Sequence, residues 1–454
     1  MKMHFSVSLI ALLCMVAACS KEKEYLNEKP DHSLSTVSTL ADCQGLLNNE
    51  FVFNFLSTTN FGTITADEFH VQDANLLTVS AIARNTYLFA QDIYQAQSDN
   101  GNWNNPYQAI YYTNVVLDFL DNFQPVANQQ VVRDNIRGAA LFLRAYFSYC
   151  LLENFSLPYD PATANINLGI PLRLTSDPAA HSTRATVAEC YKQILADLMR
   201  AKLLLPLTVS IQTKPSKVCA YALLARVYLG MADYQNALLY ADSSLQLNNK
   251  LDDYNNIQPL DNSISGTLLS EDIFHTTSVP AEVLQVQVTL VDSSLFNLYT
   301  DNDLRKQLFY KDINGPVYRG TYDYRGMIYS GLANDEIYLI RAECFARNGD
   351  VANAMADLNT LLKQRFVRNT FVPYAAANGD DALASILQER RKELVCRGLR
   401  WTDLRRLNRE GRFKTTLVRV ASGQTYTLPP GDPRYAMPFP PEEIKLSGIP
   451  QNVR

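Results

Sequence analysis

Histidine and tryptophan are scarce in this sequence, and the usual signatures of catalysis are missing. The 454 residues include 5 His and 2 Trp. The histidines are scattered, none forms an H-E-x-x-H pair, and neither a G-x-S-x-G motif nor a glycine-rich phosphate loop occurs. Adjacent acids such as Asp67 and Glu68 do not by themselves create the facing carboxylates that a glycosidase needs. We therefore expect no enzymatic activity and no metal or other cofactor.

An excess of charge of one sign and long apolar runs are lacking as well. The formal net charge is -5, from 41 basic and 46 acidic side chains. This mildly acidic balance gives no support to nucleic-acid binding, which usually shows a basic stripe. Beyond the first residues, no apolar run approaches the roughly 20 residues that span a bilayer. With 47% hydrophobic residues, the chain can bury the core of one large domain or two smaller ones.

The first residues resemble an export signal. Lys2 precedes an apolar run at 7–16, and small residues at 16–18 come directly before Cys19. This order is typical of a signal peptide. A cysteine at that place resembles a bacterial lipobox, in which the cysteine is lipidated and becomes the mature N-terminus. We predict a lipoprotein signal peptide over 1–18, with an ordinary secretory signal and a chance cysteine as the alternative.

The segment after Cys19 suits a tether. Residues 20–24 are Ser-Lys-Glu-Lys-Glu, a charged stretch that cannot bury apolar area. It resembles the charged tag of surface-exposed lipoproteins in Bacteroidota-type bacteria. We expect 19–36 to link the lipid on Cys19, whose several acyl chains would hold firmly in the membrane, to a folded body over 37–454.

Six further cysteines would remain in that body, and none forms a C-x-x-C pair. Most lie at apolar positions of predicted helices, which favours buried free thiols that act as small hydrophobic side chains. Disulfides in an exported protein are the alternative, and the sequence cannot choose among their pairings. The six are Cys43, Cys150, Cys190, Cys219, Cys344 and Cys396.

Apolar residues recur at three- and four-residue steps through most of the body, which predicts a mostly α-helical fold. Thr186 and Glu189 have the spacing of a capping box at the start of one such helix, and Pro206 stops it. The predicted single helices lie at 37–51, 103–123, 131–154 and 186–205, and the predicted helix pairs at 216–247, 335–365 and 381–397 with 401–410.

Two of the predicted pairs have the spacing of tetratricopeptide repeats. Ala225 and Ala237 in the first are matched by Ala342 and Ala354 in the second. Small residues at these positions let two antiparallel helices approach closely. The pairs are far apart in the chain, so they form a helix-pair scaffold interrupted by insertions and not a tandem array of short period.

The main insertion, 248–331, is predicted to be rich in loops with minor β-structure. Its clearest element is an alternating strand from Val283 to Leu290, with Leu284 on the apolar side and Thr289 on the polar side. The proline-rich tail at 427–454 is predicted to be a loop over the surface.

An arginine-rich block occupies 389–406. Phosphate binding is one interpretation, but acids alternate with the arginines, which favours ion pairs within and between helices. We expect Asp403 to pair with arginine there.

Several segments, in order along the chain, resemble the SusD/RagB family. The match begins at the lipobox and ends at Gln451-Asn452, although Val453-Arg454 replaces the usual Pro-Gly-aromatic finish and Cys396-Arg397 stands where the family often has an acid. The other segments are Tyr25–Pro30, Trp103–Asn114, Arg137–Tyr146, Asp335–Glu343, Glu389–Leu394, Gly398–Arg406 and Tyr435–Pro440.

This resemblance implies a mostly α-helical fold with four tetratricopeptide-like helix pairs. It also implies a lid-like partnership with a TonB-dependent outer-membrane barrel of the SusC type. Ligands of the family are usually glycans, and some members handle peptides.

Two aromatic regions are candidates for ligand capture, because the apolar faces of sugar rings stack on aromatic side chains while polar groups fix orientation. The first is Trp103-Asn104-Asn105, for which core packing is the alternative. The second is the loop 318–325, for which contact with its own scaffold is the alternative. From it we select Tyr318, Tyr322, Tyr324 and Arg325 as ligand-binding residues.

The sequence thus predicts a lipoprotein of the outer membrane, facing the outside of the cell, that binds an oligosaccharide and delivers it to a SusC-like transporter. A peptide-binding relative of RagB, a tetratricopeptide-type scaffold that binds proteins, and a surface glycosidase are the alternatives.

Overall fold

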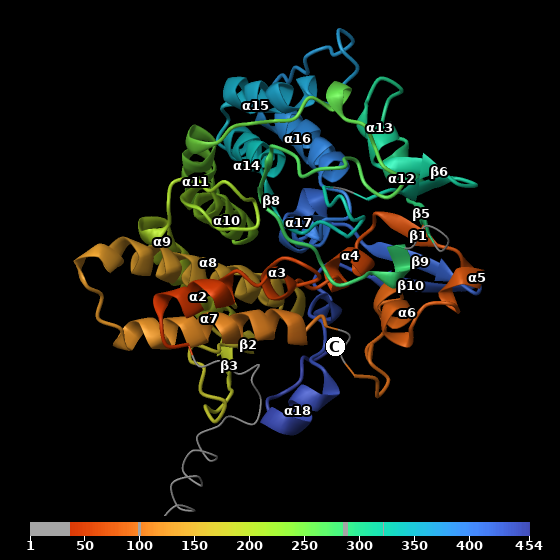
Figure 1. The fold of residues 1–454 in the computed structure, drawn as a ribbon. Coiled ribbons are helices and arrows are strands. Elements are labelled where there is room, and N and C mark those ends of the chain that lie inside the picture. Colours follow the sequence, from red (N-terminus) through yellow and green to blue (C-terminus); the bar gives the residue numbers. More distant parts are fainter. Residues whose placement is uncertain (1–36, 99–100, 285–288, 321) are drawn as a thin grey trace, which may run out of the picture.

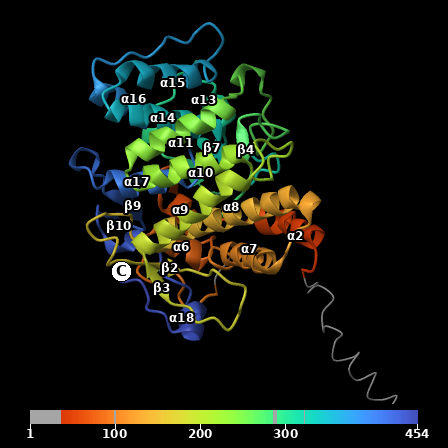
Figure 2. The same ribbon diagram turned by 90° about the vertical axis from the view of Figure 1, so that its left-hand side faces the viewer.

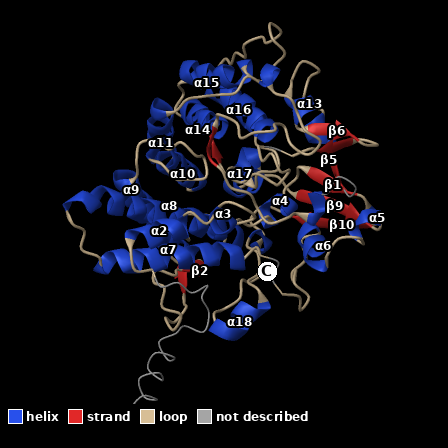
Figure 3. Ribbon diagram, in the orientation of Figure 1, coloured by secondary structure: helices blue, strands red, loops and turns tan. Residues whose placement is uncertain are grey.

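The computed structural model describes residues 37–98, 101–284, 289–320 and 322–454. The predicted signal peptide, the lipidation of Cys19 and the tether lie outside these ranges. Within them the fold is mostly α-helical with short strand pairs (Figure 3), as the sequence predicts. Every helix in the described part is too short or too polar to cross a membrane.

The long helices lie before and after the insertion 248–331, whereas short strands occur before, within and after it. The helices are α2 (Leu40–Leu47), α3 (Glu50–Phe53), α4 (Phe61–Thr65), α5 (Asp73–Leu76), α6 (Ala81–Tyr87), α7 (Asn104–Asn122), α8 (Gln130–Phe155), α9 (Val187–Leu204), α10 (Lys217–Gly230), α11 (Tyr234–Leu247), α12 (Ser293–Phe296), α13 (Arg305–Leu308), α14 (Asn334–Arg347), α15 (Val351–Lys363), α16 (Gly379–Glu393), α17 (Leu399–Leu407) and α18 (Pro441–Ser447). The antiparallel strand pairs are β1 (Phe69–Val71) with β5 (Thr289–Val291), β2 (Leu168–Pro171) with β3 (Arg184–Thr186), β4 (Asp272–Phe274) with β8 (Leu332–Ala333), β6 (Tyr310–Asp312) with β7 (Pro316–Tyr318), and β9 (Leu417–Ala421) with β10 (Gln424–Leu428).

The long helices form one stack. Helices α7, α8 and α9 pack side by side, followed by α10 with α11 and by α14 with α15 and α16 (Figures 1 and 2). Helix α11 packs directly on α14, although the whole insertion separates them in the chain. Ala225, Ala237, Ala342 and Ala354 are all fully buried, which confirms that small side chains allow the paired helices to approach closely.

The first predicted helix is wrong in its extent, because 37–51 forms two helices. Asn48 ends α2, and the side chain of Asn49 accepts a hydrogen bond from the backbone N–H of Phe51 to cap α3. Two consecutive asparagines compete with the helical backbone through such local bonds. The break turns Phe51 out into solvent, where it is 82% exposed. At 186–205 the prediction holds, since Thr186 and Glu189 form the expected capping box.

The predicted strand at 283–290 is wrong at its start. Residues 282–284 form a 3-10 turn, residues 285–288 lie outside the described part, and Thr289 and Leu290 belong to strand β5 as predicted. Val283 and Leu284 are both buried, which a strand with one buried face cannot achieve at adjacent positions. Glu282 fixes this turn by accepting a hydrogen bond from the backbone N–H of Ser80 at 2.6 Å.

The core has three parts. The largest lies within the helical stack, a second joins the insertion to residues 64–88, and a third lies between α14, α15 and α16. The six cysteines of the body are free thiols and five of them are buried, as expected of small hydrophobic side chains. The tail departs from the predicted loop, because it contributes the end of β10 and helix α18.

Candidate functional site

The arginine-rich block is part of the core and not a surface for phosphate. Arg390 donates from Nε to Asp403 at 2.8 Å, and Arg406 donates to both Asp403 and Glu343. All of these side chains are buried. The predicted role in packing and ion pairing, with Asp403 as an arginine partner, is confirmed.

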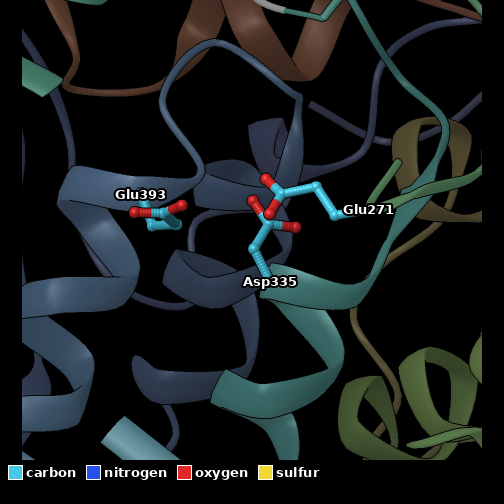
Figure 4. A group of neighbouring side chains, drawn as sticks. All are labelled: Glu271, Asp335 and Glu393. Atoms are coloured by element: carbon cyan, nitrogen blue, oxygen red, sulfur yellow. The ribbon is translucent and has the colours of Figure 1, made fainter. Parts of the chain in front are cut away.

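Three buried carboxylates face one another beside this block (Figure 4). They come from Glu271 before β4, Asp335 in the first turn of α14 and Glu393 at the end of α16. Arginines already bind all three, through the pairs Arg365–Glu271 at 2.8 Å, Arg397–Asp335 at 2.8 Å, Arg365–Glu393 at 2.6 Å and Arg305–Glu393 at 2.8 Å. We therefore interpret the carboxylates as members of a buried ion network that joins the insertion to α14 and α16, and call them with their arginines the carboxylate network.

The loop 318–325 divides between this network and the surface. Tyr322 is fully buried, and its hydroxyl donates to Asp335 at 2.8 Å and also contacts Glu271. Tyr318 is buried on β7, where its ring packs against Tyr310. Both tyrosines are therefore framework residues in this structure, and their burial argues against the predicted role as ligand contacts. Tyr324 is 46% exposed and Arg325 is partly exposed.

Tyr324 and Arg325 belong to a surface group that we call the Arg325 patch: Phe51, Phe55, Tyr324 and Arg325. The guanidinium carbon of Arg325 lies 4.7 Å from the ring centre of Phe55 and 5.3 Å from that of Tyr324. The rings of Phe51 and Phe55 meet edge to face at 6.0 Å. Exposed aromatic side chains that adjoin one another are unusual on a protein surface unless they bind something.

Arg325 is held by a chain of buried groups. Asp323 accepts from its Nε and from its Nη2, the latter at 2.6 Å. Behind Asp323, the imidazole of His275 lies 3.0 Å from Asp323 by Nε2 and 2.6 Å from Asp272 by Nδ1. Burial lowers the pKa of His275, but hydrogen bonds to the two carboxylates outweigh it and raise that pKa to about 9. At neutral pH the ring is therefore an imidazolium that donates from both nitrogens.

The other predicted region, Trp103-Asn104-Asn105, lies at the start of α7. Like the loop 318–325, it contains both framework residues and residues near a surface cavity. Trp103 is only 3% exposed, and its ring packs on Phe155 and Phe439, each at 4.9 Å. Trp103 is therefore mainly a core residue, as the alternative interpretation of the sequence proposed. Asn105 donates to the backbone oxygen of Leu56 at 2.7 Å, so it anchors the segment that carries Phe55.

Trp103 and Asn104 nevertheless line a cavity of about 350 Å³, which we call the Trp103 pocket. The indole Nε1 of Trp103 donates to Glu443 of α18 at 3.3 Å. Tyr107 and the 43% exposed Tyr111 continue the aromatic lining along α7. A cavity of this size with aromatic and polar walls can hold a small part of a sugar chain.

Four residues of this site were not predicted from the sequence: Phe51, Phe55, Asp323 and His275. The two phenylalanines alternate with the buried Phe53, a period that does not fit the predicted helix and could have indicated an irregular, partly exposed segment. For His275 and Asp323 the sequence offers no signal, because 48 positions separate them.

Two family descriptions match the chain. One, described as SusD-like and "Starch-binding associating with outer membrane", matches residues 24–229. The other, described as the SusD family, matches residues 335–447. No curated protein matches the sequence.

Solved structures with the same fold come from Bacteroides species. A SusD superfamily protein from Bacteroides thetaiotaomicron is 21% identical, with a TM-score of 0.71 over 92% of this chain and 100% of its own. A SusD-like carbohydrate binding protein from Bacteroides vulgatus is 20% identical, with a TM-score of 0.64 over 90% and 96%. The surface glycan-binding protein A from Bacteroides fluxus is 18% identical, with a TM-score of 0.67 over 91% and 99%. With both family descriptions matched in order and the fold shared along nearly the whole length, this chain belongs to the SusD/RagB family.

Proposed function

We propose that this protein is a lipoprotein of the outer cell surface that binds an oligosaccharide at the Arg325 patch and delivers it to a SusC-like TonB-dependent transporter. In this proposal residues 1–18 are the signal peptide, Cys19 carries the lipid, 19–36 is the tether and 37–454 is the binding domain. The family supports the setting, since one of its descriptions names starch binding and the outer membrane. The protein's work is capture and transfer, without bond chemistry.

The observation that carries the proposal is the exposure of adjoining aromatic rings around one arginine. Phe51 and Tyr324 are 82% and 46% exposed, yet Phe51 contacts the ring of Phe55, and the guanidinium of Arg325 lies beside the rings of Phe55 and Tyr324. Sugar C–H faces stack on such rings, and a guanidinium donates to hydroxyl or ring oxygens. Asp323 occupies Nε and Nη2 of Arg325, so Nη1 is the edge that can donate to a ligand.

The Trp103 pocket is the second candidate location for the same function. It offers the partly exposed Tyr111 and the amide of Asn104. The two locations are neighbours through residues 55–56, because Asn105 binds Leu56 and Arg325 lies over Phe55. One oligosaccharide could therefore contact either of them, and variants must decide between them.

Affinity electrophoresis against a panel of neutral and acidic glycans tests the proposal. We expect at least one glycan to retard the wild-type protein, and Tyr324→Ala to weaken that binding about tenfold or more, as expected for an aromatic anchor. Tyr111→Ala is the matched control, since it removes an equally exposed tyrosine from the Trp103 pocket. If Tyr111→Ala abolishes binding and Tyr324→Ala does not, the site is the Trp103 pocket.

Further measurements test the rest of the proposal. Mass spectrometry of the mature protein should find acyl chains on Cys19, and a pull-down from outer membranes should recover a barrel protein. Reducing ends released from the bound glycan by purified protein would contradict a role in capture alone. Retardation by no glycan, together with binding of peptides, would replace the oligosaccharide by a peptide ligand.

A further inference from the structure

The strongest unexplained feature of the molecule is the buried histidine beneath the Arg325 patch. His275 is 1% exposed and stands between two carboxylates, at 2.6 Å from Asp272 and 3.0 Å from Asp323. Asp272 is fixed in turn by the hydroxyl of Tyr329, which donates to it at 2.8 Å. A buried imidazolium with two carboxylate partners costs desolvation energy, and a nonpolar residue could have filled the same space. Its position therefore calls for an explanation.

Asp323 connects this histidine to the surface. Besides Nε2 of His275, it accepts from the backbone N–H of Arg325 at 2.8 Å and of Met327 at 3.3 Å. The N–H of Gly326 donates to the backbone oxygen of Asp323 at 3.0 Å. One carboxylate thus shapes the turn 323–327 and also holds the guanidinium of Arg325. If Asp323 moved, the turn and Arg325 would move together.

We propose that His275 is a positioning residue for recognition at the Arg325 patch: by holding Asp323 from below, it fixes the turn 323–327 and the guanidinium of Arg325 beside Phe55 and Tyr324. This inference rests on the proposed function. A long, partly exposed arginine loses much side-chain entropy when a ligand immobilises it. An arginine already fixed by the fold avoids that loss on binding, so the histidine's contribution appears in affinity.

His275→Gln tests the role because glutamine is neutral and its amide donates from only one nitrogen. Asp197→Asn is the matched control. Asp197 is buried and accepts twice from Arg144 at 2.7 Å, and it lies on α9 in the helical stack, away from the patch. The probe is the neutral glycan that most retards the wild-type protein, measured by isothermal titration. We expect His275→Gln to weaken binding about tenfold and Asp197→Asn to bind as wild type, although both lower the melting temperature.

A ligand-free measurement separates this inference from the proposed function. The Nε–H of Arg325 donates to Asp323, so its ¹H–¹⁵N resonance should be sharp and slow to exchange in the wild type, absent in Arg325→Lys, and fast to exchange in His275→Gln. Unchanged exchange in His275→Gln overturns the inference, whether or not a glycan binds. Equal loss of affinity in Asp197→Asn also overturns it, because the effect would then be one of stability. If His275→Gln does not fold, Asp272→Asn keeps the histidine and removes the negative charge of its rear partner, and a threefold to tenfold loss of affinity is expected.

Discussion

Arg305 and Arg325 carry the same group in opposite settings. Arg305 is fully buried in the carboxylate network and donates to Asp303, Glu389 and Glu393, so all sides of its guanidinium are used. Arg325 is partly exposed and, among the residues that the structure describes, its guanidinium donates to Asp323 alone, with aromatic rings beside it. A saturated guanidinium can only hold the fold together. One that is fixed along one edge keeps the other edge for a ligand.

The largest effect on stability is expected when a carboxylate is removed from the carboxylate network. Glu393→Ala removes the carboxylate that joins Arg305 and Arg365, and leaves both guanidinium groups underpaired. Loss of one partner from a buried ion pair lowers the free energy of unfolding by about 3–5 kcal/mol. Urea denaturation measures this loss. The exposed pair Asp301–Lys306 provides the control, since Asp301→Asn should leave the denaturation midpoint unchanged.

The carboxyl group of Glu68, which forms no ion pair within the described part of the chain, sharpens the buried side of the comparison. Glu68 is buried, its side chain accepts one hydrogen bond there, from the backbone N–H of Cys396 at 3.0 Å, and burial raises its pKa to about 8. The folded state therefore keeps a proton that the unfolded state releases near pH 4.5, so stability falls as the pH rises from about 4.5 to 8. Glu68→Gln should remove this pH dependence, because the amide does not titrate. The variant should therefore be more stable than the wild type at pH 9. Equal pH dependence in both proteins would contradict the assignment.

A smaller effect on stability is expected for Tyr322, the buried tyrosine of the loop that also carries the exposed Tyr324. Tyr322→Phe removes the hydroxyl that contacts Glu271 and donates to Asp335, so each of these buried carboxylates loses one of its hydrogen bonds. We expect the free energy of unfolding to fall by about 1–3 kcal/mol. Glycan affinity should stay within twofold of the wild type, about the error of titration, because Tyr322 has no exposed surface. A large loss of affinity at unchanged stability would place Tyr322 in the binding site after all.

The smallest effect on stability is expected at Tyr324, the exposed tyrosine of the same loop. Tyr324→Phe keeps the ring and removes a hydroxyl at the surface, so stability should change by less than about 0.5 kcal/mol. Binding should weaken less than in Tyr324→Ala if stacking is the main contact. Equal weakening in the two variants would instead make the hydroxyl the recognised group. Thermal unfolding and titration with the same glycan give both quantities.

The predictions that held rest on local patterns. The period of 3.6 residues located α7 to α11 and α14 to α17, and the alternation of charge in 389–406 indicated ion pairing before any partner was known. Those that failed required distant contacts. Nothing near Val283 indicates that Ser80 will bind Glu282 and turn the chain there. Nothing in 318–325 distinguishes the tyrosine that is buried from the one that is exposed.

By itself, then, the sequence determined the helical scaffold and the family, because periodicity, capping residues and motif order are local properties of the chain. The export signal that it also indicates stays a prediction. Only the tertiary structure decided which aromatic residues can meet a ligand. Burial depends on segments far apart in sequence: Phe55, His275 and Arg325 come together solely because the insertion folds back on the N-terminal helices.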